Sequence, residues 1–333
     1  MIVEPLSVDN QKKACKVRKK TVISETSAVQ ASKPPPQVPT MLKNKMFRDY
    51  SIEERKNYIT LSSGEFYPDI LPEACELYKP VLVTFESLMK RAASSTLLFE
   101  YISEEGDQNM RTQLCRVFRK YVSPSTPVEL LKKKSMCKEI CQDFGSHFRP
   151  IQEVQAKFAT RPIPDEALCA LLWEYKDRGK KGYDLTEQFF HIIEHNYPGV
   201  VICGPRRAGK DVQPRDFWPD YPNENRPLDF VITSKNGKQI YAVGLARYDG
   251  DRGGAQEDDR PGGYDSCASE LQSYIVRHKL KTKILFVNDG PGLLLGTMWN
   301  DYSRIEEKYA GLLMVMTLRM IPERLTTRWL KGE

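Results

Sequence analysis

The feature that most constrains the fold is a pair of apolar runs joined by an Asn-Gly turn within residues 227–260. The runs 228–233 and 239–248 are rich in β-branched and aromatic residues, and the sequence SKNG lies between them. An Asn-Gly pair between two such runs is typical of a tight β-hairpin. The stretch therefore predicts two neighbouring antiparallel strands.

Carboxylates gather at the ends of this predicted hairpin. Asp229 opens the first strand, and the second strand runs into a glycine-rich stretch that holds Asp249, Asp251 and Glu257. Acids crowded at one edge of a sheet repel each other unless a cation lies between them, and carboxylate oxygens are ligands that Mg²⁺ prefers. The pattern is that of a magnesium site or of a solvated acidic loop.

Around the hairpin, helical periodicity alternates with short apolar runs. We expect a mixed α/β domain over residues 179–333, with the core order α-β-β-β-α-β and helices on both faces of the sheet. A short charged linker at residues 177–182 (DRGKKG) is expected to precede it. The expected elements are a helix at 185–195, strands at 199–203, 228–233 and 239–248, a helix at 266–278, a strand at 283–288, a helix at 299–309 and a strand at 312–318.

The N-terminal half has a different character. Residues 46–178 show apolar residues at three-to-four spacing, including a run at 127–143, which predicts a mainly helical domain. Its role is either DNA recognition and dimerisation or that of a plain scaffold. Residues 1–45 combine a lysine-rich cluster with a Pro34-Pro35-Pro36 run and few large apolar residues, which predicts a disordered basic arm. Such an arm either binds along the phosphate groups of a nucleic acid or is a solvated tail without a binding role.

Bulk properties exclude several classes of protein. The formal net charge is +6 and the isoelectric point is about 8.7, which mildly favours an anionic partner. No apolar run approaches the length of a membrane span, and the polar, basic start lacks the apolar region of a signal peptide. The eight cysteines form no CxxC pair, which argues against a zinc ribbon. We therefore expect a cytoplasmic protein with reduced thiols and no membrane partner.

Two tempting motifs fail on physical grounds. Residues 204–210 (GPRRAGK) have the spacing of a nucleotide-binding P-loop, but Asp211 stands where Ser or Thr binds Mg²⁺, and Pro214 blocks the helix that should follow. We therefore expect no nucleotide cofactor. An ATPase that hydrolyses ATP with the help of Lys210 stays as a less favoured alternative function. Residues 191–195 (HIIEH) match an inverted zinc-peptidase pattern, but NYPG ends that helix at once.

Residues 183–288 resemble the PD-(D/E)xK nuclease superfamily, and specifically type II restriction endonucleases. The resemblance rests on Glu187 in the first helix, Pro227-Leu228-Asp229 as the PD element, and residues 241–247 as the strand of the second motif. It implies a restriction-endonuclease-like core and Mg²⁺-dependent, sequence-specific cleavage of double-stranded DNA. A two-fold symmetric DNA site would require a homodimer. Glu187 would support the site.

The second motif departs from the family pattern. Leu245 stands in the place of the second acid, and Arg247 in that of the lysine. Arginine keeps the positive charge but cannot act as a base, so the missing carboxylate must come from elsewhere. We expect Asp229, Arg247 and Glu257 to be catalytic. The expected metal ligands are Asp229, Glu257, Asp249, Asp251 and Asp211.

Basic residues near these acids are expected to contact DNA. Arginine binds phosphate oxygens with two parallel hydrogen bonds and can read guanine in the major groove. The expected DNA-binding residues are Arg206, Arg207, Lys210, Arg252 and Arg260. The main alternative is a DNA-binding protein whose nuclease core is catalytically degenerate, because the second motif is incomplete.

Overall fold

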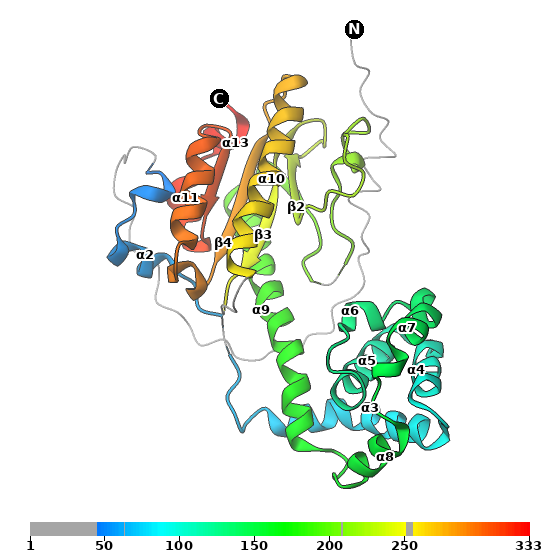
Figure 1. The fold of residues 1–333 in the computed structure, drawn as a ribbon. Helices are drawn as coiled ribbons and strands as arrows, with labels where there is room; N and C mark the ends of the chain where they lie inside the picture. Colours follow the sequence, from blue (N-terminus) through cyan, green and yellow to red (C-terminus); the bar gives the residue numbers. More distant parts are fainter. Residues whose placement is uncertain (1–44, 63, 208, 251–255) are drawn as a thin grey trace. The chain divides into compact units, whose positions relative to one another are not determined.

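The computed structural model describes residues 45–62, 64–207, 209–250 and 256–333, without the side chains of residues 177–179 and 256–260. Nearly all of the predicted basic arm lies outside these ranges, as do Asp251 and Arg252. The described residues form two compact units (Figure 1): residues 64–179 make a helical unit, and residues 45–62 with those described after 179 make a sheet unit.

The helical unit is built from amphipathic helices around an aromatic core. Phe85, Phe99 and Phe118 are fully buried at its centre. The predicted helix at 127–143 is wrong, since its run of three lysines is exposed and breaks it into two helices. The helices are α3 (Leu71–Arg91), α4 (Ser95–Glu104), α5 (Gln108–Tyr121), α6 (Val128–Leu131), α7 (Cys137–Phe144), α8 (Ile151–Ala159) and the first part of α9 (Glu166–Asn196).

The sheet unit contains a five-stranded mixed sheet with the strand order β1-β2-β3-β4-β5. The pairs β1–β2 and β2–β3 are antiparallel, whereas β3–β4 and β4–β5 are parallel. The mixed α/β class and the order α-β-β-β-α-β are confirmed, including the hairpin at the Asn-Gly turn, where Gly237 has a φ of 70°. The strands are β1 (Val200–Cys203), β2 (Phe230–Ser234), β3 (Ile240–Tyr248), β4 (Lys283–Asp289) and β5 (Leu313–Met316).

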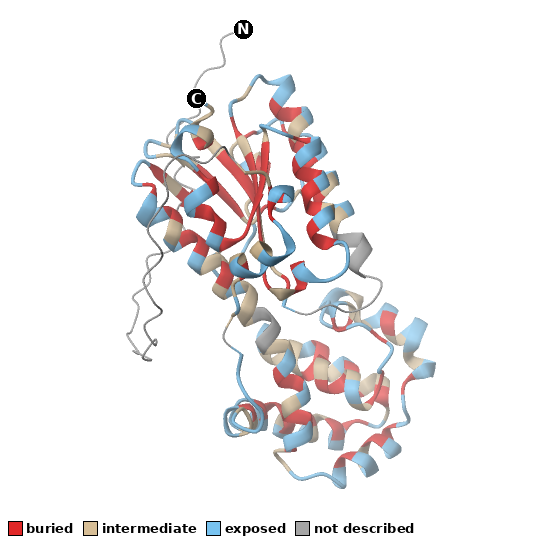
Figure 2. Cartoon of the chain, turned by 90° about the vertical axis from the view of Figure 1, so that its left-hand side faces the viewer, coloured by how far each residue is buried: buried red, intermediate tan, exposed pale blue. Residues whose placement is uncertain are grey.

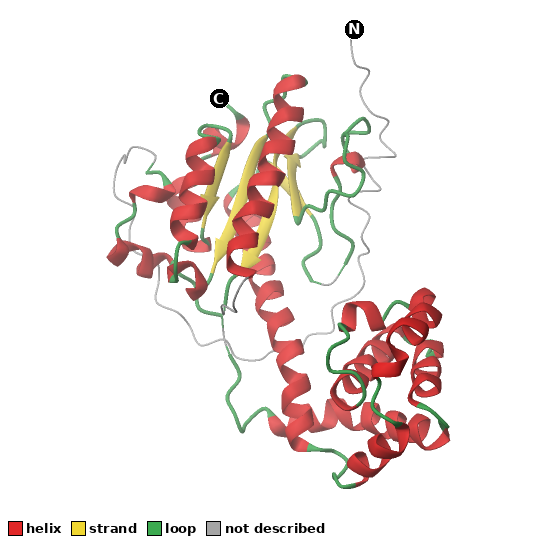
Figure 3. Ribbon diagram, in the orientation of Figure 1, coloured by secondary structure: helices red, strands yellow, loops and turns green. Residues whose placement is uncertain are grey.

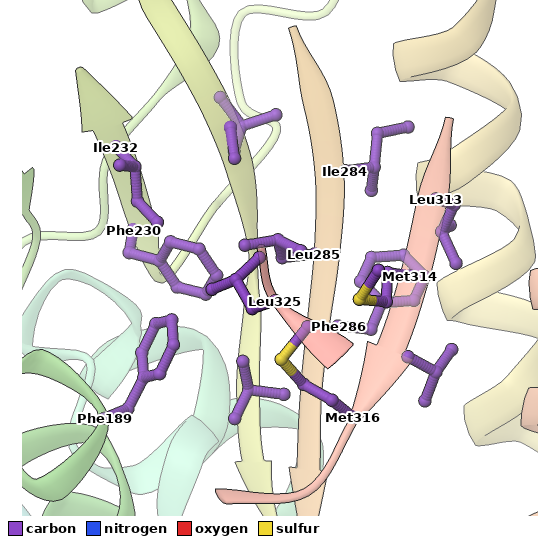
Figure 4. Packing of buried hydrophobic residues seen from close by; sticks show 14 of the residues in the cluster. Phe189, Phe230, Ile232, Ile284, Leu285, Phe286, Leu313, Met314, Met316 and Leu325 are labelled. Atoms are coloured by element: carbon purple, nitrogen blue, oxygen red, sulfur yellow. The ribbon is translucent and has the colours of Figure 1, made fainter. Parts of the chain in front are cut away.

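Helices cover both faces of this sheet, and Figure 3 shows them around the strands. Phe189 of α9 packs on Phe230 of β2, with ring centroids 4.7 Å apart, as the close-up of the core shows (Figure 4). Tyr264 of α10 (Gln256–Arg277) packs on Phe286 of β4, also at 4.7 Å. The strand register places Phe230 and Phe286 on opposite faces, because side chains alternate along a strand. Strands β4 and β5 are buried along nearly all of their length, whereas β3 is buried only in its middle, and Figure 2 shows buried strands next to the helices.

Two predictions of local structure around the sheet are wrong, although the two units divide at residues 179 and 180, next to the expected boundary. The linker expected at 177–182 lies inside α9, a 31-residue helix. Its two glycines cost about 1 kcal/mol each in a helix, but Trp173 and Leu185, buried on either side of the glycines, hold the helix in place. Helix α10 begins at Gln256, ten residues before the predicted start, although Pro261 lies inside it. Its buried residues Tyr264 and Cys267 anchor the helix, which extends backwards from them.

Residues 45–62 pack with the sheet unit, although the sequence grouped residues 46–178 as one helical region. Phe47 stacks on Trp299 at 4.0 Å, and its N–H donates to Glu306 at 2.6 Å. Glu306 also forms a buried ion pair with Arg324 at 2.6 Å. The remaining helices of this unit are α2 (Ile52–Tyr58), α11 (Met298–Lys308), α12 (Ile321–Arg324) and α13 (Thr327–Lys331).

Candidate active site at the ends of β2 and β3

Asp229 lies immediately before β2, in a position fixed by its backbone neighbours. Its N–H donates to the Gly244 carbonyl at 3.0 Å, and its Oδ2 accepts from the Ala246 N–H at 2.7 Å. Gly204 has a φ of 155°, and a Cβ added there would lie 2.2 Å from the Asp229 carbonyl oxygen. Only glycine allows this close approach, so β1 and β3 together fix where the Asp229 carboxylate lies.

Asp211 is brought opposite Asp229 by a short antiparallel bridge between Val212 and Leu228. The two backbone hydrogen bonds of this bridge measure 2.9 and 2.8 Å. Burial raises the pKa of Asp229 to about 6, and the charge of Asp211 adds to that rise. The hydrogen bond from the Ala246 N–H and the positive charge of Arg247 lower the pKa of Asp229. Two neighbouring carboxylates of this kind are more stable with a cation between them.

Arg247 lies on the same face of the sheet as Asp229. The pairing of Phe230 with Gly244 places Leu245 opposite Asp229, and Arg247 follows two residues later. The Arg247 side chain is 41% exposed, and its Nε lies 3.2 Å from Oδ1 of Asp249. The positive charge expected in the second motif is therefore next to Asp229, whereas the position of the second acid is apolar.

Asp249 is the acid after β3 that the structure brings to this site. Its side chain is buried, and its N–H donates to the Asp289 carbonyl at 2.7 Å, while its own carbonyl accepts from the Gly292 N–H at 2.8 Å. A Cβ added at Gly290 or Gly292 would lie 2.4 or 2.8 Å from the Asp249 carbonyl oxygen. The turn after β4, with Gly290 and Gly292, therefore packs closely against the Asp249 backbone and fixes its position, and the Asp249 carboxylate lies next to Arg247.

Sequence reasoning missed two further residues of this region. Asn288 of β4 lies opposite Arg247 across the parallel pair β3–β4 and is fully buried. The Tyr264 hydroxyl donates to Asn288 Oδ1 at 3.0 Å. Burial raises the pKa of Tyr264 well above its usual value, and the nearby charges of Asp229 and Asp249 contribute, so its hydroxyl remains a donor. The only sequence signal for these two residues is Asn288 itself, a polar residue near the end of the otherwise apolar run of β4.

Other expected site residues lie elsewhere or are not described. Glu187 accepts from Arg207 Nη2 at 2.8 Å, and Arg206 pairs with Glu194, so these arginines contact α9 in the free protein. Lys210 is exposed next to Asp211. The positions of Glu257 and Arg260 fall within the first turns of α10 rather than in a loop, and their side chains lie outside the described residues, as do Asp251 and Arg252 entirely.

Asp289, at the end of β4, has a structural role. Its Oδ1 accepts from the backbone N–H groups of Thr60 at 2.8 Å and Gly290 at 2.7 Å, and its Oδ2 accepts from that of Leu318 at 2.9 Å. Burial raises its pKa, and these N–H groups oppose the rise. This carboxylate joins three separate segments of the chain.

The residues of the two rejected motifs lie in a loop after β1 and in the last turns of α9. The loop 204–210 leads into the Val212–Leu228 bridge instead of opening a helix. His191 and His195 stack at 5.9 Å on an exposed face of α9. In the part of the chain that the structure describes, no three His, Cys, Asp or Glu side chains are placed to hold one metal ion.

The structure and the comparisons with known proteins add two negative findings. Among the described residues, none of the helices combines the length and apolar character needed to cross a membrane. Comparisons of the chain with protein-family models, with curated proteins and with solved structures give no match.

Proposed function

We propose that this protein is a Mg²⁺-dependent, sequence-specific endodeoxyribonuclease of the type II restriction class. The observation that carries the proposal is the opposed pair of Asp211 and Asp229 beside Arg247, where β2 begins and β3 ends. The element order α-β-β-β-α-β is the one that the resemblance to restriction endonucleases implies, which supports the proposal.

The donor set suits a magnesium ion. Mg²⁺ is commonly bound by one or two carboxylates and several waters, and Asp211 and Asp229 supply two carboxylates. The Ala246 N–H occupies one oxygen of Asp229 and leaves Oδ1 for another contact. When bound, Mg²⁺ would neutralise charge on the phosphate and activate a water molecule. The pKa of about 6 at Asp229 means that its charge is disfavoured without such a partner.

Arg247 would stabilise the negative charge that develops on the reacting phosphate. Its guanidinium remains protonated at any physiological pH, so it provides charge and hydrogen bonds and does not remove protons. Asp249 holds the Arg247 Nε, while the partial exposure of this side chain keeps it within reach of a substrate. Asp249 therefore acts as a positioning residue for Arg247 in this scheme.

The loop 204–211 would bind the DNA backbone beside this site. Its first residue, Gly204, packs against the Asp229 carbonyl, and its last residue precedes the Val212–Leu228 bridge. Both ends of the loop are thus held next to Asp229, and Arg206, Arg207 and Lys210 lie between them. A homodimer would place two such sites on a two-fold symmetric DNA sequence.

Cleavage of supercoiled plasmid DNA by the purified full-length protein tests the proposal. We expect nicked and linear products in Mg²⁺ or Mn²⁺ and none in EDTA. Asp229→Asn is nearly isosteric and should reduce cleavage by at least about 100-fold while DNA binding is retained. The matched control is Asp69→Asn, an exposed residue of the helical unit, which should cut at the wild-type rate. Equal cleavage by wild type and Asp229→Asn would remove Asp229 from the site.

A DNA-binding protein with a degenerate nuclease core is the second candidate function. The observation in its favour is Leu245, which lies opposite Asp229 where the family pattern requires an acid. Tight DNA binding with no cleavage in Mg²⁺ or Mn²⁺ would support it. Leu245→Glu then offers a direct test, because a carboxylate there would complete the ligand set and should produce cleavage in a protein that lacked it.

A further inference from the structure

Two ion pairs fasten the arginines of loop 204–211 to helix α9. Arg206 Nη2 pairs with Glu194 Oε1, and Arg207 Nη2 pairs with Glu187 Oε2 at 2.8 Å. The two glutamates are seven residues apart, so they lie on one face of the helix, about 10.5 Å apart along its axis. Adjacent arginines thus diverge to two separate carboxylates.

These pairs lie at the surface and are weak. The side chains are 44% and 45% exposed for Arg206 and Glu194, and 61% and 45% exposed for Arg207 and Glu187. A solvent-exposed ion pair shifts an equilibrium by at most about fivefold. A DNA phosphate offers the same arginine two parallel hydrogen bonds, and its binding also releases counterions. Phosphate can therefore replace the glutamates at little cost.

Arg206 would keep its position during such an exchange. Its guanidinium lies over the ring of Phe190, 5.3 Å from the ring centroid, and Phe190 is almost fully buried. A cation over an aromatic face is attracted to it independently of Glu194. The ends of the loop are also fixed, at Gly204 and before Val212. The arginine side chains can change partners while Asp211 remains opposite Asp229.

We infer that Glu187 and Glu194 compete within the molecule with nucleic-acid phosphates for Arg207 and Arg206. The loop is restrained by α9 in the free protein and binds DNA by exchanging carboxylate for phosphate. This inference rests on the DNA binding in the proposed function and does not depend on cleavage. It assigns Glu187 an autoinhibitory role, in place of a supporting role at the metal.

The test is the affinity of the full-length variant Glu187→Gln/Glu194→Gln for a fluorescent 20-base-pair duplex. Fluorescence anisotropy is measured in EDTA, which prevents cleavage, at several NaCl concentrations. We expect binding about 3- to 25-fold tighter than wild type, since two weak competitors have been removed. Adding Arg206→Gln/Arg207→Gln to the same variant should abolish this gain.

The matched control is Glu53→Gln/Glu307→Gln, which changes the net charge equally and breaks the exposed pairs with Lys56 and Arg48. A gain equal to that of this control would overturn the inference, because net charge alone would explain it. Unchanged affinity, or a gain that survives loss of both arginines, would also overturn it. If no variant binds the duplex, the inference and the proposed DNA binding fail together. Tighter binding of the duplex, together with no cleavage in the separate plasmid assay in Mg²⁺, would support the inference and count against the nuclease activity alone.

Discussion

Asp229→Asn should make the sheet unit more stable at neutral pH while it removes the proposed activity. The Asp229 carboxylate is mostly buried and faces the charge of Asp211, and both effects disfavour its ionised form. Asparagine has nearly the same shape, and its carbonyl oxygen can still accept from the Ala246 N–H. The substitution therefore removes an unfavourable charge and preserves the local hydrogen bond.

The size of the effect follows from the pKa of Asp229, which rises from 3.8 to about 6. A rise of about two units corresponds to about 3 kcal/mol, and partial solvent exposure lowers the expected gain to about 1–3 kcal/mol. Below about pH 3 the carboxyl group is mostly protonated in the folded and unfolded states, and the variant has almost no advantage. Wild type loses stability as the pH rises through about 4 to 6, and the full difference is present above that range.

Hydrogen exchange of the β3 and β4 amides, read by mass spectrometry, measures the stability of the sheet unit separately from the helical unit. In EDTA at pH 7.5, exchange in Asp229→Asn should be slower than in wild type, and the difference should be much smaller when the two are compared at pH 4. Asp69→Asn controls for the change in net charge. In addition, Mg²⁺ at ten times its dissociation constant should stabilise wild type by about 1.4 kcal/mol and leave Asp229→Asn unchanged. Equal or lower stability of Asp229→Asn at pH 7.5 would refute the electrostatic reasoning.

Three further predictions concern the residues around Asp229. Gly204→Ala should lower the unfolding temperature and weaken Mn²⁺ binding measured by calorimetry, because the added Cβ would lie 2.2 Å from the Asp229 carbonyl oxygen; unchanged binding would contradict this placement. Arg247→Ala should reduce plasmid cleavage by at least about 100-fold with near-normal Mn²⁺ binding, and an unaffected rate would exclude Arg247 from the chemistry. Asp289→Ala should destabilise the fold by about 3 kcal/mol or more in urea unfolding, because three backbone N–H groups lose their acceptor; a loss below about 1 kcal/mol would argue against its role in joining the segments.

The sequence predicted the strands of the sheet well because local signals determine them. The β-branched runs and the Asn-Gly turn specify the β2–β3 hairpin without help from distant residues. The continuity of α9 was not predictable in this way, since glycines and charges at 177–182 resemble a linker. Packing on both sides of that stretch, by residues such as Trp173 and Leu185, outweighs the local preference.

The site was only partly predictable, for a related reason. Asp229 and Arg247 could be predicted as site residues because each lies in or directly beside a strand with a clear pattern. The pairing of Asp211 with Asp229 depends on the Val212–Leu228 bridge, which no local pattern indicates. Glu257 was expected in a glycine-rich loop, but its position falls within α10, because a helix anchored by Tyr264 and Cys267 extends back to Gln256. The contact of Tyr264 with Asn288 joins residues 24 positions apart and had no signature in the sequence.

The docking of residues 45–62 on the sheet unit has a consequence for how the chain is made. Phe47 contacts Trp299 and Glu306, so the first described segment has its partners more than 250 residues later. The helical unit, residues 64–179, is an insertion within the sheet unit and can complete its own core while the ribosome is still translating the rest. The early segment, with the apolar surface of Phe47, remains exposed until α11 emerges. A newly made chain is therefore most prone to aggregation, and most in need of a chaperone, after residues 45–62 have left the ribosome and before α11 has been translated.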